Sequence, residues 1–572
     1  MPDRDPGLAK AGLIRGPAAS RLARGAALWG LLVVSLLGIG LLIYFTRTGL
    51  AIRDDSVRYV MGAENLMSGR GYSRTSGGGE LYPETGFAPF LSIMLAAVGS
   101  LGLDMLVGAR LLNVVLFGLS ILLVAVMIYR FARSWVAAAL GSVLFLFAPN
   151  VLESHAWLMT EALFVFLMLL SLWSLLQFLD TGRTGALILS GCLVGAASIT
   201  RYIGLSLAPA GALAVLWLGR GSWRTRLTQA IGFAALGVAP FLVWMLRNQA
   251  VGGAGVANRQ LIFHMIRPDL VRFYLFEAAS WSLPDVFVVP RAIRAAIAFA
   301  VTGSGPTWYI LQGWRRWRAG AAFDRGSFGG LPWVFLLNLA SYVVVLVLNS
   351  VLLDAGTTEP AATRYLVPFF SMLVVFETSV YADLVLRTHR RAFRVVGLAF
   401  AGVMIALYAQ RSIAVAQAST LPLGITGIRE RWSQAAADIA RLAGEQPIIS
   451  NNPEVVYYLV GRPAYFMPIK YDPYQQQDRQ DFEDQLRLAV TRLKRGSPLV
   501  IFQPPKPWEA EALERLEVVP LRVYQDVIIY GYPASGGSSR WGELSVGNGA
   551  WERVGRRGDR PVSPKMDGRR TQ

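Results

Sequence analysis

The chain has 572 residues, of which 54% are hydrophobic and only 16% are charged, and its mean hydropathy is +0.43. A soluble protein carries about 25% charged residues, so this composition excludes a soluble globular protein and indicates an integral membrane protein. The net charge of +18 comes from short basic clusters between apolar segments, a pattern that argues against a nucleic-acid-binding protein.

About eleven apolar segments predict a polytopic α-helical membrane domain. The first, Ala26 to Phe45, follows three arginines and is too long for the core of a signal peptide, so we expect an uncleaved helix with its N-terminus inside. The other ten are Leu111 to Tyr129, Trp135 to Leu152, Ala162 to Leu179, Gly185 to Ile199, Ile203 to Leu218, Leu227 to Leu246, Ala295 to Leu311, Leu331 to Leu353, Tyr365 to Leu386 and Val395 to Tyr408. With this count, the arginine clusters of the loops fall on the inner side, as the positive-inside rule requires.

The loops expected outside begin with residues 46–110. Within them Pro89 to Leu103 is apolar, but a span there would move Arg130 and every later arginine cluster to the outside, so we expect a helix lying on the outer surface. A second outer loop, residues 249–290, mixes basic and aromatic residues, including His264 and Arg267. It suits either an interfacial helix that gates a cavity or a structural cover over the helix ends.

The first outer loop holds adjacent acids, Asp54 and Asp55. Apolar residues recur at helical spacing from Ser56 to Met67, which predicts a helix with Asp55 as its N-cap. A carboxylate at the membrane surface could act as a general base on an acceptor hydroxyl, or could be a solvated cap with no further role. Gly77 to Gly79 are expected to form only a flexible loop tip.

The outer ends of later helices add an acid, Glu161, and three arginines, Arg201, Arg247 and Arg364. Each arginine alone could be an interfacial residue whose charged end reaches water. However, the outer side is where few arginines are expected. An outward-facing cavity with both acids and arginines suits an anionic lipid phosphate bound beside a polar acceptor.

After the last span, residues 412–533 read as a small α/β domain outside the membrane. We expect helices at 430–444, 454–460 and 508–516, and strands at 447–450, 499–502, 521–524 and 527–530. The tail, residues 534–572, is rich in glycine, serine and arginine and is predicted to be disordered, and the basic N-terminus, residues 1–25, to be cytoplasmic.

Taken together, these motifs resemble the bacterial relatives of protein O-mannosyltransferases and of lipid A aminoarabinose transferase, which are GT-C glycosyltransferases. The resemblance runs from the first helix to Pro533 and rests on the order and membrane placement of short motifs. These motifs are Asp55-x-x-Arg58-Tyr59, Ala63-Glu64-Asn65-Leu66, Gly69-x-Gly71-Tyr72, Tyr82-Pro83, Thr160-Glu161, Arg201-Tyr202, Arg247-Asn248 and Arg364-Tyr365. The resemblance implies a GT-C fold, with its N-terminus inside and its C-terminus outside, that moves a sugar from a polyprenyl-phosphate carrier to a lipid, glycan or protein acceptor with inversion.

The resemblance also implies roles for residues. Asp55 matches the first-loop aspartate, the base or acceptor-orienting group, with Asp54 as the alternative, and Glu161 matches a second acidic residue of the site. The implied phosphate-binding residues are Arg201, Arg247 and Arg364, and the implied substrate-binding residues are Arg58, Tyr59, Glu84, Tyr202 and Tyr365. One departure is that the aminoarabinose transferases have a Lys-Pro pair in the first loop, where this chain has Tyr82-Pro83, so the phosphate contact must come from elsewhere.

Other interpretations stay open. A transporter or flippase of a lipid-linked glycan would share the outer cavity, although polar groups in mid-membrane are scarce apart from Glu377 and Gly303 to Pro306. A weaker alternative is a catalytically inactive membrane scaffold. No cofactor is implied with certainty, and Asp54 and Asp55 alone do not establish a divalent cation. One cysteine, Cys192, excludes a disulfide within the chain.

Overall fold

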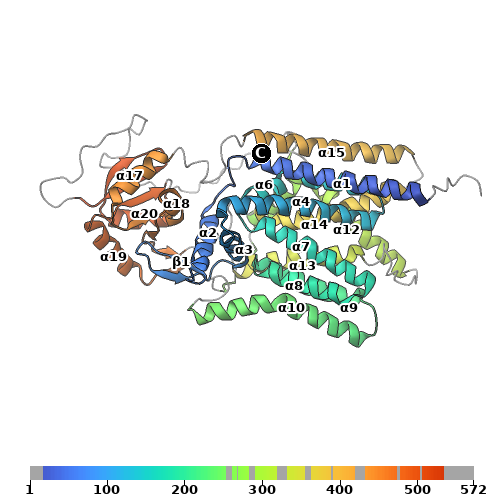
Figure 1. Cartoon of the computed structure of the whole chain (residues 1–572), viewed down its shortest axis with the longest axis horizontal. Helices are drawn as coiled ribbons and strands as arrows, with labels where there is room; N and C mark the ends of the chain where they lie inside the picture. Colours follow the sequence, from blue (N-terminus) through green and yellow to red (C-terminus); the bar gives the residue numbers. More distant parts are fainter. Residues whose placement is uncertain are drawn as a thin grey trace, which may run out of the picture.

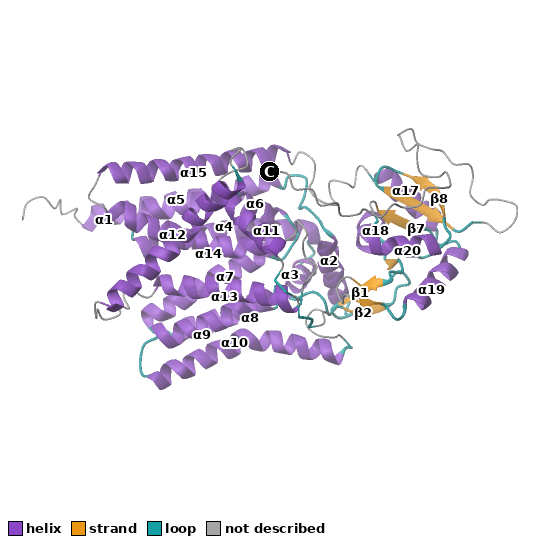
Figure 2. Cartoon of the chain, turned by 180° about the vertical axis from the view of Figure 1, so that it is seen from behind, coloured by secondary structure: helices purple, strands orange, loops and turns teal. Residues whose placement is uncertain are grey.

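The computed structural model describes residues 17–252, 261–263, 265–266, 268–282, 290–318, 331–353, 363–387, 391–418, 432–472, 477–502 and 505–533. A bundle of long helices forms one part, and a small α/β domain lies beyond one end of it (Figures 1 and 2). Helix α2 (Asp54–Met67) and strands β1 (Ser73–Thr75) and β2 (Leu81–Pro83) lie between the two parts (Figures 1 and 2). The predicted disordered tail, residues 1–16, His264 and Arg267 lie outside the described residues.

In the described part of the chain, seven helices are long and apolar enough to cross a membrane. They are α1 (Pro17–Phe45), α4 (Met105–Ala132), α7 (Glu161–Thr181), α10 (Trp223–Ala250), α13 (Leu331–Leu352), α14 (Thr363–Arg387) and α15 (Arg391–Ala418). An eighth span is counted if a pair bent by 55°, α5 (Trp135–Leu146) and α6 (Pro149–Ala156), is taken as one. Proline at the start of α6 explains the break, because it has no N–H to continue the helix. This confirms a polytopic helical membrane protein.

Each of the eleven predicted spans falls on a helix, but three do not meet the same test of length and apolarity. Helix α8 (Thr184–Ser198) is short, as is α9 (Leu207–Leu218), which follows the 3-10 helix η2 (Tyr202–Ser206). Helix α12 (Arg291–Arg318) is long, but the run from Gly303 to Pro306 lowers its hydropathy. Helix α3 (Phe90–Ser100) spans only about 16 Å at 1.5 Å per residue, too short for a bilayer, as expected for a surface helix.

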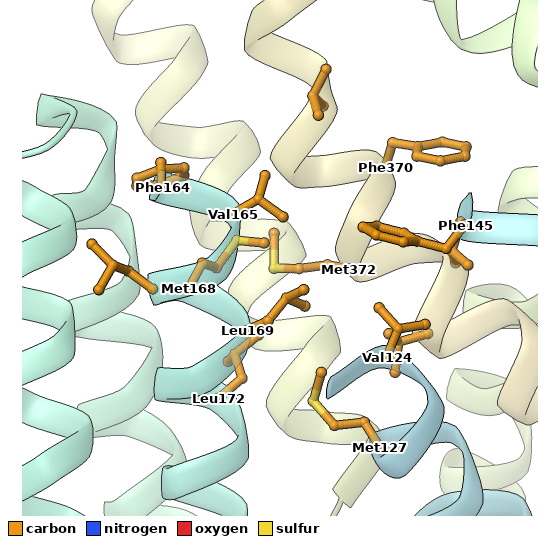
Figure 3. Close-up of a cluster of buried hydrophobic side chains, with 14 of the residues drawn as sticks. Val124, Met127, Phe145, Phe164, Val165, Met168, Leu169, Leu172, Phe370 and Met372 are labelled. Atoms are coloured by element: carbon orange, nitrogen blue, oxygen red, sulfur yellow. The ribbon is translucent and has the colours of Figure 1, made fainter. Parts of the chain in front are cut away.

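The centre of the bundle is built from α4, α5, α7 and α14. Figure 3 shows Met127, Phe145, Met168 and Met372, one from each of these helices, packed together, and all four are fully buried. In the apolar stretch of α7, 72% of the residues are buried within the protein, whereas in that of α15 the share is 6%. Helices α7 and α14 are therefore held by close packing, and residues at their ends have well-defined positions.

The C-terminal domain has a five-stranded sheet of order β4-β3-β7-β9-β8. Its strands are β3 (Ile448–Ser450), β4 (Ala464–Phe466), β7 (Leu499–Phe502), β8 (Val519–Val523) and β9 (Val527–Gly531), with helices α17 (Ser433–Ala443), α18 (Pro453–Val460), α19 (Phe482–Lys494) and α20 (Pro507–Arg515). The described residues also form β5 (Tyr471–Asp472), β6 (Gln477–Asp478) and, in the second outer loop, α11 (Pro268–Ser282). The predicted α/β class is correct, although β4 and α19 were not expected.

The first outer loop differs from its prediction in two places, the start of α2 and the glycine tip. Helix α2 (Asp54–Met67) begins two residues earlier than expected, with Arg53 as the N-cap, because the Ser56 hydroxyl accepts a hydrogen bond of 3.0 Å from the Arg53 amide. Asp55 therefore lies in the first turn and is not the cap. The glycine tip joins β1 (Ser73–Thr75) to β2 (Leu81–Pro83) and packs on β4, since a Cβ on Gly77 would lie 2.5 Å from the Tyr465 amide nitrogen.

This close approach predicts that Gly77→Ala weakens docking of the hairpin on β4 by about 1–3 kcal/mol, because backbone must move to admit the methyl group. Amide hydrogen exchange in β1, β2 and β4 should become faster. A matched control is Gly40→Ala in α1, where an added Cβ meets no atom within 4 Å. Unchanged exchange in the Gly77 variant would contradict this packing.

Candidate functional site

Four charged residues from separate parts of the chain meet at the end of the bundle that faces the C-terminal domain. Glu161 is the first residue of α7, Arg364 lies in the first turn of α14, and Asp55 lies in the first turn of α2. Arg201 immediately precedes η2. Two of the four therefore stand on the two most buried helices of the bundle.

These residues form a row of alternating charge, Asp55, Arg364, Glu161 and Arg201, which we call the charged row. Arg201 Nη1 donates to Glu161 Oε1 and, over 3.0 Å, to the Thr160 hydroxyl. Arg364 lies between the two acids, with Nε 3.8 Å from Glu161 Oε1 and Nη1 3.1 Å from Asp55 Oδ2. Each inner member of the row thus contacts two groups of opposite charge.

The two halves of the row differ in exposure. The side chains of Glu161 and Arg201 are 2% and 9% exposed, whereas those of Arg364 and Asp55 are 26% and 30% exposed. A buried carboxylate is costly unless it is compensated, and two guanidinium groups compensate Glu161. Burial opposes the charge of Arg201, but the Glu161 carboxylate outweighs this effect and raises the pKa of Arg201. Glu161 and Arg201 form the fixed floor of the site, and Arg364 and Asp55 form its open edge.

Aromatic residues line the row. The Tyr365 ring lies 5.3 Å from the guanidinium carbon of Arg201 and 5.5 Å from that of Arg364, which adds cation–π attraction to both. The Tyr342 hydroxyl donates to the Tyr365 carbonyl over 2.6 Å. Tyr59 is buried on α2, and burial, with a contribution from Asp55, raises the pKa of its hydroxyl.

A second group of predicted site residues fixes the first outer loop in place, and we call this group the loop clamp. Arg58 Nη2 donates to Glu84 Oε2 over 2.7 Å, and the other Glu84 oxygen accepts from the Gly86 amide at 2.9 Å. Arg247 donates to the carbonyls of Glu84 and Tyr72 over 2.6 and 2.8 Å. Three residues expected to touch substrate, Arg58, Glu84 and Arg247, thus hold the loop between α2 and α10.

Tyr202 borders the clamp, and Asp54 lies apart from both groups. The Tyr202 hydroxyl accepts from Trp244 Nε1 over 3.0 Å and lies 3.5 Å from the Gly86 carbonyl. Asp54 faces the C-terminal domain, where its Oδ2 accepts from Asn452 Nδ2 at 3.1 Å. Although Asp54 and Asp55 are adjacent in sequence, they therefore have different partners, as residues 100° apart on a helix should.

Two contributors were not singled out from the sequence. Tyr342 lies inside an apolar span, where only its hydroxyl distinguishes it, and Asn452 lies just before the helix expected at residues 454–460. Among the described residues, no group of three or more histidine, cysteine, aspartate or glutamate side chains is placed to hold a metal ion.

The loop clamp predicts that Arg247→Lys impairs the protein although the charge is kept, because an ammonium group cannot hold two separate carbonyls as the planar guanidinium does. We expect faster hydrogen exchange over residues 72–87 and roughly 10-fold weaker turnover. If lysine preserved both exchange and turnover, Arg247 would act as a simple point charge and not as a clamp.

Sequence comparison matches residues 87–244 to the family model of dolichyl-phosphate-mannose-protein mannosyltransferase. The matched stretch contains Glu161, Arg201 and Tyr202 of the site, and it ends before Arg364. No curated relative matches the chain by sequence.

Solved structures match over almost the whole chain. ArnT from Cupriavidus metallidurans bound to undecaprenyl phosphate has 13% identity and a TM-score of 0.52, covering 88% of this chain and 99% of ArnT. The apo form of ArnT gives 14% identity and 0.53, covering 89% and 98%. The archaeal oligosaccharyltransferase AglB from Archaeoglobus fulgidus, in complex with an inhibitory peptide and a dolichol-phosphate, gives 12% and 0.52, covering 86% and 71%.

At these identities the structural matches establish the fold, and they confirm the predicted fold class. The family model and these solved structures are all those of glycosyltransferases. The chain is therefore a polytopic membrane protein with the GT-C fold, and its residues 87–244 carry the match to the mannosyltransferase family.

Proposed function

We propose that this protein is a membrane glycosyltransferase that moves a sugar from a polyprenyl-phosphate carrier to a lipid, glycan or protein acceptor, with inversion. The observation that carries the proposal is the charged row at one end of a GT-C bundle. It combines two guanidinium groups suited to a lipid phosphate with a partly exposed carboxylate suited to an acceptor hydroxyl.

The donor class is supported by chemistry and by fold. ArnT was solved with undecaprenyl phosphate and AglB with a dolichol-phosphate, so two proteins of this fold bind lipid phosphates at a membrane. In this chain Arg364, being 26% exposed, is the guanidinium that a phosphate can reach from the open edge. Arg201, behind it, is fixed on Glu161 and Thr160 and supplies a preorganised positive charge.

The proposed reaction is a single displacement at the anomeric carbon. The acceptor oxygen forms a bond to that carbon as the bond from the carbon to the phosphate oxygen breaks, and Asp55 takes the hydroxyl proton. The leaving polyprenyl phosphate gains one negative charge, which Arg364 and Arg201 stabilise. Attack from the side opposite the phosphate inverts the anomeric centre.

Arg364 gives this reaction an order. Without donor, its Nη1 occupies Asp55 Oδ2, one of the two oxygens that could take the proton. A donor phosphate would draw the guanidinium toward itself, because a charge-assisted bond to phosphate is strong. Donor binding thereby frees Asp55, so the donor should bind before the acceptor reacts.

We place the site at the outer face of the cytoplasmic membrane, with the C-terminal domain outside, since the arginine clusters of the loops then lie inside. Membrane lipids are the expected surroundings, and nucleic acid is not an expected partner. A transporter or flippase of a lipid-linked glycan is the alternative that the first experiment below separates.

In membranes supplied with labelled polyprenyl-phosphate sugars, the native chain should consume one donor. Asp55→Asn should lower kcat by roughly 100- to 10,000-fold while donor binding remains, because the amide cannot accept the proton. Arg201→Ala should lower kcat by roughly 100- to 1,000-fold through loss of charge stabilisation.

Full turnover in Asp55→Asn would contradict the assignment of the base. If instead no donor is consumed and the labelled lipid changes leaflet, the transporter interpretation replaces the transferase.

A divalent cation is tested separately. The guanidinium groups can neutralise the phosphate, so treatment with EDTA should leave the transfer rate within about twofold of its starting value. Loss of transfer that Mg²⁺ or Mn²⁺ restores would show instead that carboxylates such as Asp54 and Asp55 hold a cation during the reaction.

A further inference from the structure

The first turn of α2 is shared between the two parts of the molecule. Ile52 and Val57 flank the acid pair in sequence, and both are buried in one apolar cluster with Trp432 and Val456 of the C-terminal domain. Ser56, between them, is completely buried, and its hydroxyl lies 3.5 Å from Met159 Sδ in the membrane domain. A shift of the C-terminal domain would therefore move the turn that carries the proposed base.

The two acids of this turn are held from opposite sides. Arg364 of the bundle donates to Asp55 over 3.1 Å, and Asn452 of the C-terminal domain donates to Asp54 over 3.1 Å. The first contact aligns Asp55 with the charged row. The second contact fixes the rotation of α2 about its axis, because it acts on the neighbouring residue 100° away.

Asn452 is itself rigid and has a defined orientation. Its Oδ1 accepts from the Val455 amide at 3.2 Å as the N-cap of α18, so its Nδ2 is the atom that faces Asp54. The preceding residue, Asn451, donates to the Phe502 carbonyl over 3.0 Å and accepts from the Phe502 amide at 2.9 Å. The tie to Asp54 is thus anchored in the central sheet of the domain.

Two further contacts fix the docking. Tyr457 donates to Glu64 at the other end of α2, and Tyr465 donates to Glu80 on the hairpin over 2.8 Å. In all three hydrogen bonds the first outer loop supplies a carboxylate and the C-terminal domain supplies a neutral donor. The domain is held along the whole length of α2.

We infer that Asn452 is a positioning residue for the transfer reaction: by its bond to Asp54 it aligns the first turn of α2, so that Asp55 alone meets the reacting groups. The inference rests on the proposed function, and it assigns the adjacent acids different tasks. Asp54 fixes the C-terminal domain, and Asp55 serves as the base. The outer domain is then part of the catalytic unit.

The test is a reversal of the hydrogen bond. Asn452→Asp keeps the cap of α18 but places a second carboxylate against Asp54, so repulsion should tilt the first turn. We expect kcat to fall roughly 10- to 100-fold with little change in KM for the donor, since misalignment of the base and not donor binding is affected. The double variant Asp54→Asn with Asn452→Asp restores a donor and an acceptor with exchanged roles, and kcat should recover to within about threefold of the native value.

Tyr465→Phe is the matched control, because it removes a hydrogen bond of the same interface whose acceptor, Glu80, lies on the hairpin and not on α2, and kcat should stay within about twofold. An unchanged kcat in Asn452→Asp would overturn the inference. Failure of the double variant to recover would also overturn it, since that is the result expected if Asp54 were the base.

Amide hydrogen exchange over residues 53–58 reports on the hydrogen bond between Asn452 and Asp54 and needs no measurement of activity. Exchange should be faster in Asn452→Asp and return to the native rate in the double variant. If the native protein transfers no sugar, the proposed function fails, and this exchange pattern alone decides whether Asn452 aligns the first turn of α2. Equal exchange in all three proteins would overturn it.

Discussion

The buried carboxylate of Glu161 sets the arrangement of everything around it. A charge that is 2% exposed at the end of the most buried helix must be compensated, and two guanidinium groups do so. One arrives from the turn between α8 and η2 and the other from the start of α14. Without Glu161, these two cations would repel each other, so the acid fixes the relative position of three chain segments at the floor of the site.

The position of Glu161 in turn constrains Arg364, Asp55 and helix α2. Arg364 has one acid on its buried side and Asp55 on its open side, which places α2 over the bundle. The loop clamp fixes the rest of the first outer loop in two ways. Arg247 binds the backbone carbonyls of Glu84 and Tyr72, and Arg58 binds the Glu84 carboxylate. A series of contacts thus links the membrane core to the C-terminal domain. The candidate site lies where the buried pair Glu161 and Arg201 meets the more exposed pair Arg364 and Asp55.

Much of the bundle could be predicted because membrane spans leave a strong signal in apolar length and in loop charge. The location of Glu161, Arg201 and Arg364 at one end followed from span counting alone. The partners could not be predicted, because nothing in sequence spacing distinguishes an arginine that binds a carboxylate from one, such as Arg247, that binds backbone carbonyls. The start of α2 was placed two residues late, since Asp55 is by residue type a good N-cap, whereas Arg53 is not and serves only because the Ser56 hydroxyl accepts from its amide. The role of Gly77 was missed because a close approach between segments almost 400 residues apart has no local signature.

The position of Glu377 bears on the choice between transferase and transporter. It follows Arg364 by 13 residues on α14, a separation of about 20 Å along the helix, or two thirds of the hydrocarbon core. It lies against Gly305 of α12, where an added Cβ would collide with its carboxyl group. Between Glu377 and the charged row, α14 presents buried Val367, Phe370 and Met372, and the Ser371 hydroxyl bonds back to its own helix. A transport path would need polar groups to continue from the outer site through this stretch. On α14 the single polar side chain between Tyr365 and Glu377 is Ser371, which bonds within its own helix, and this favours a reaction completed at the end of the bundle that carries the charged row.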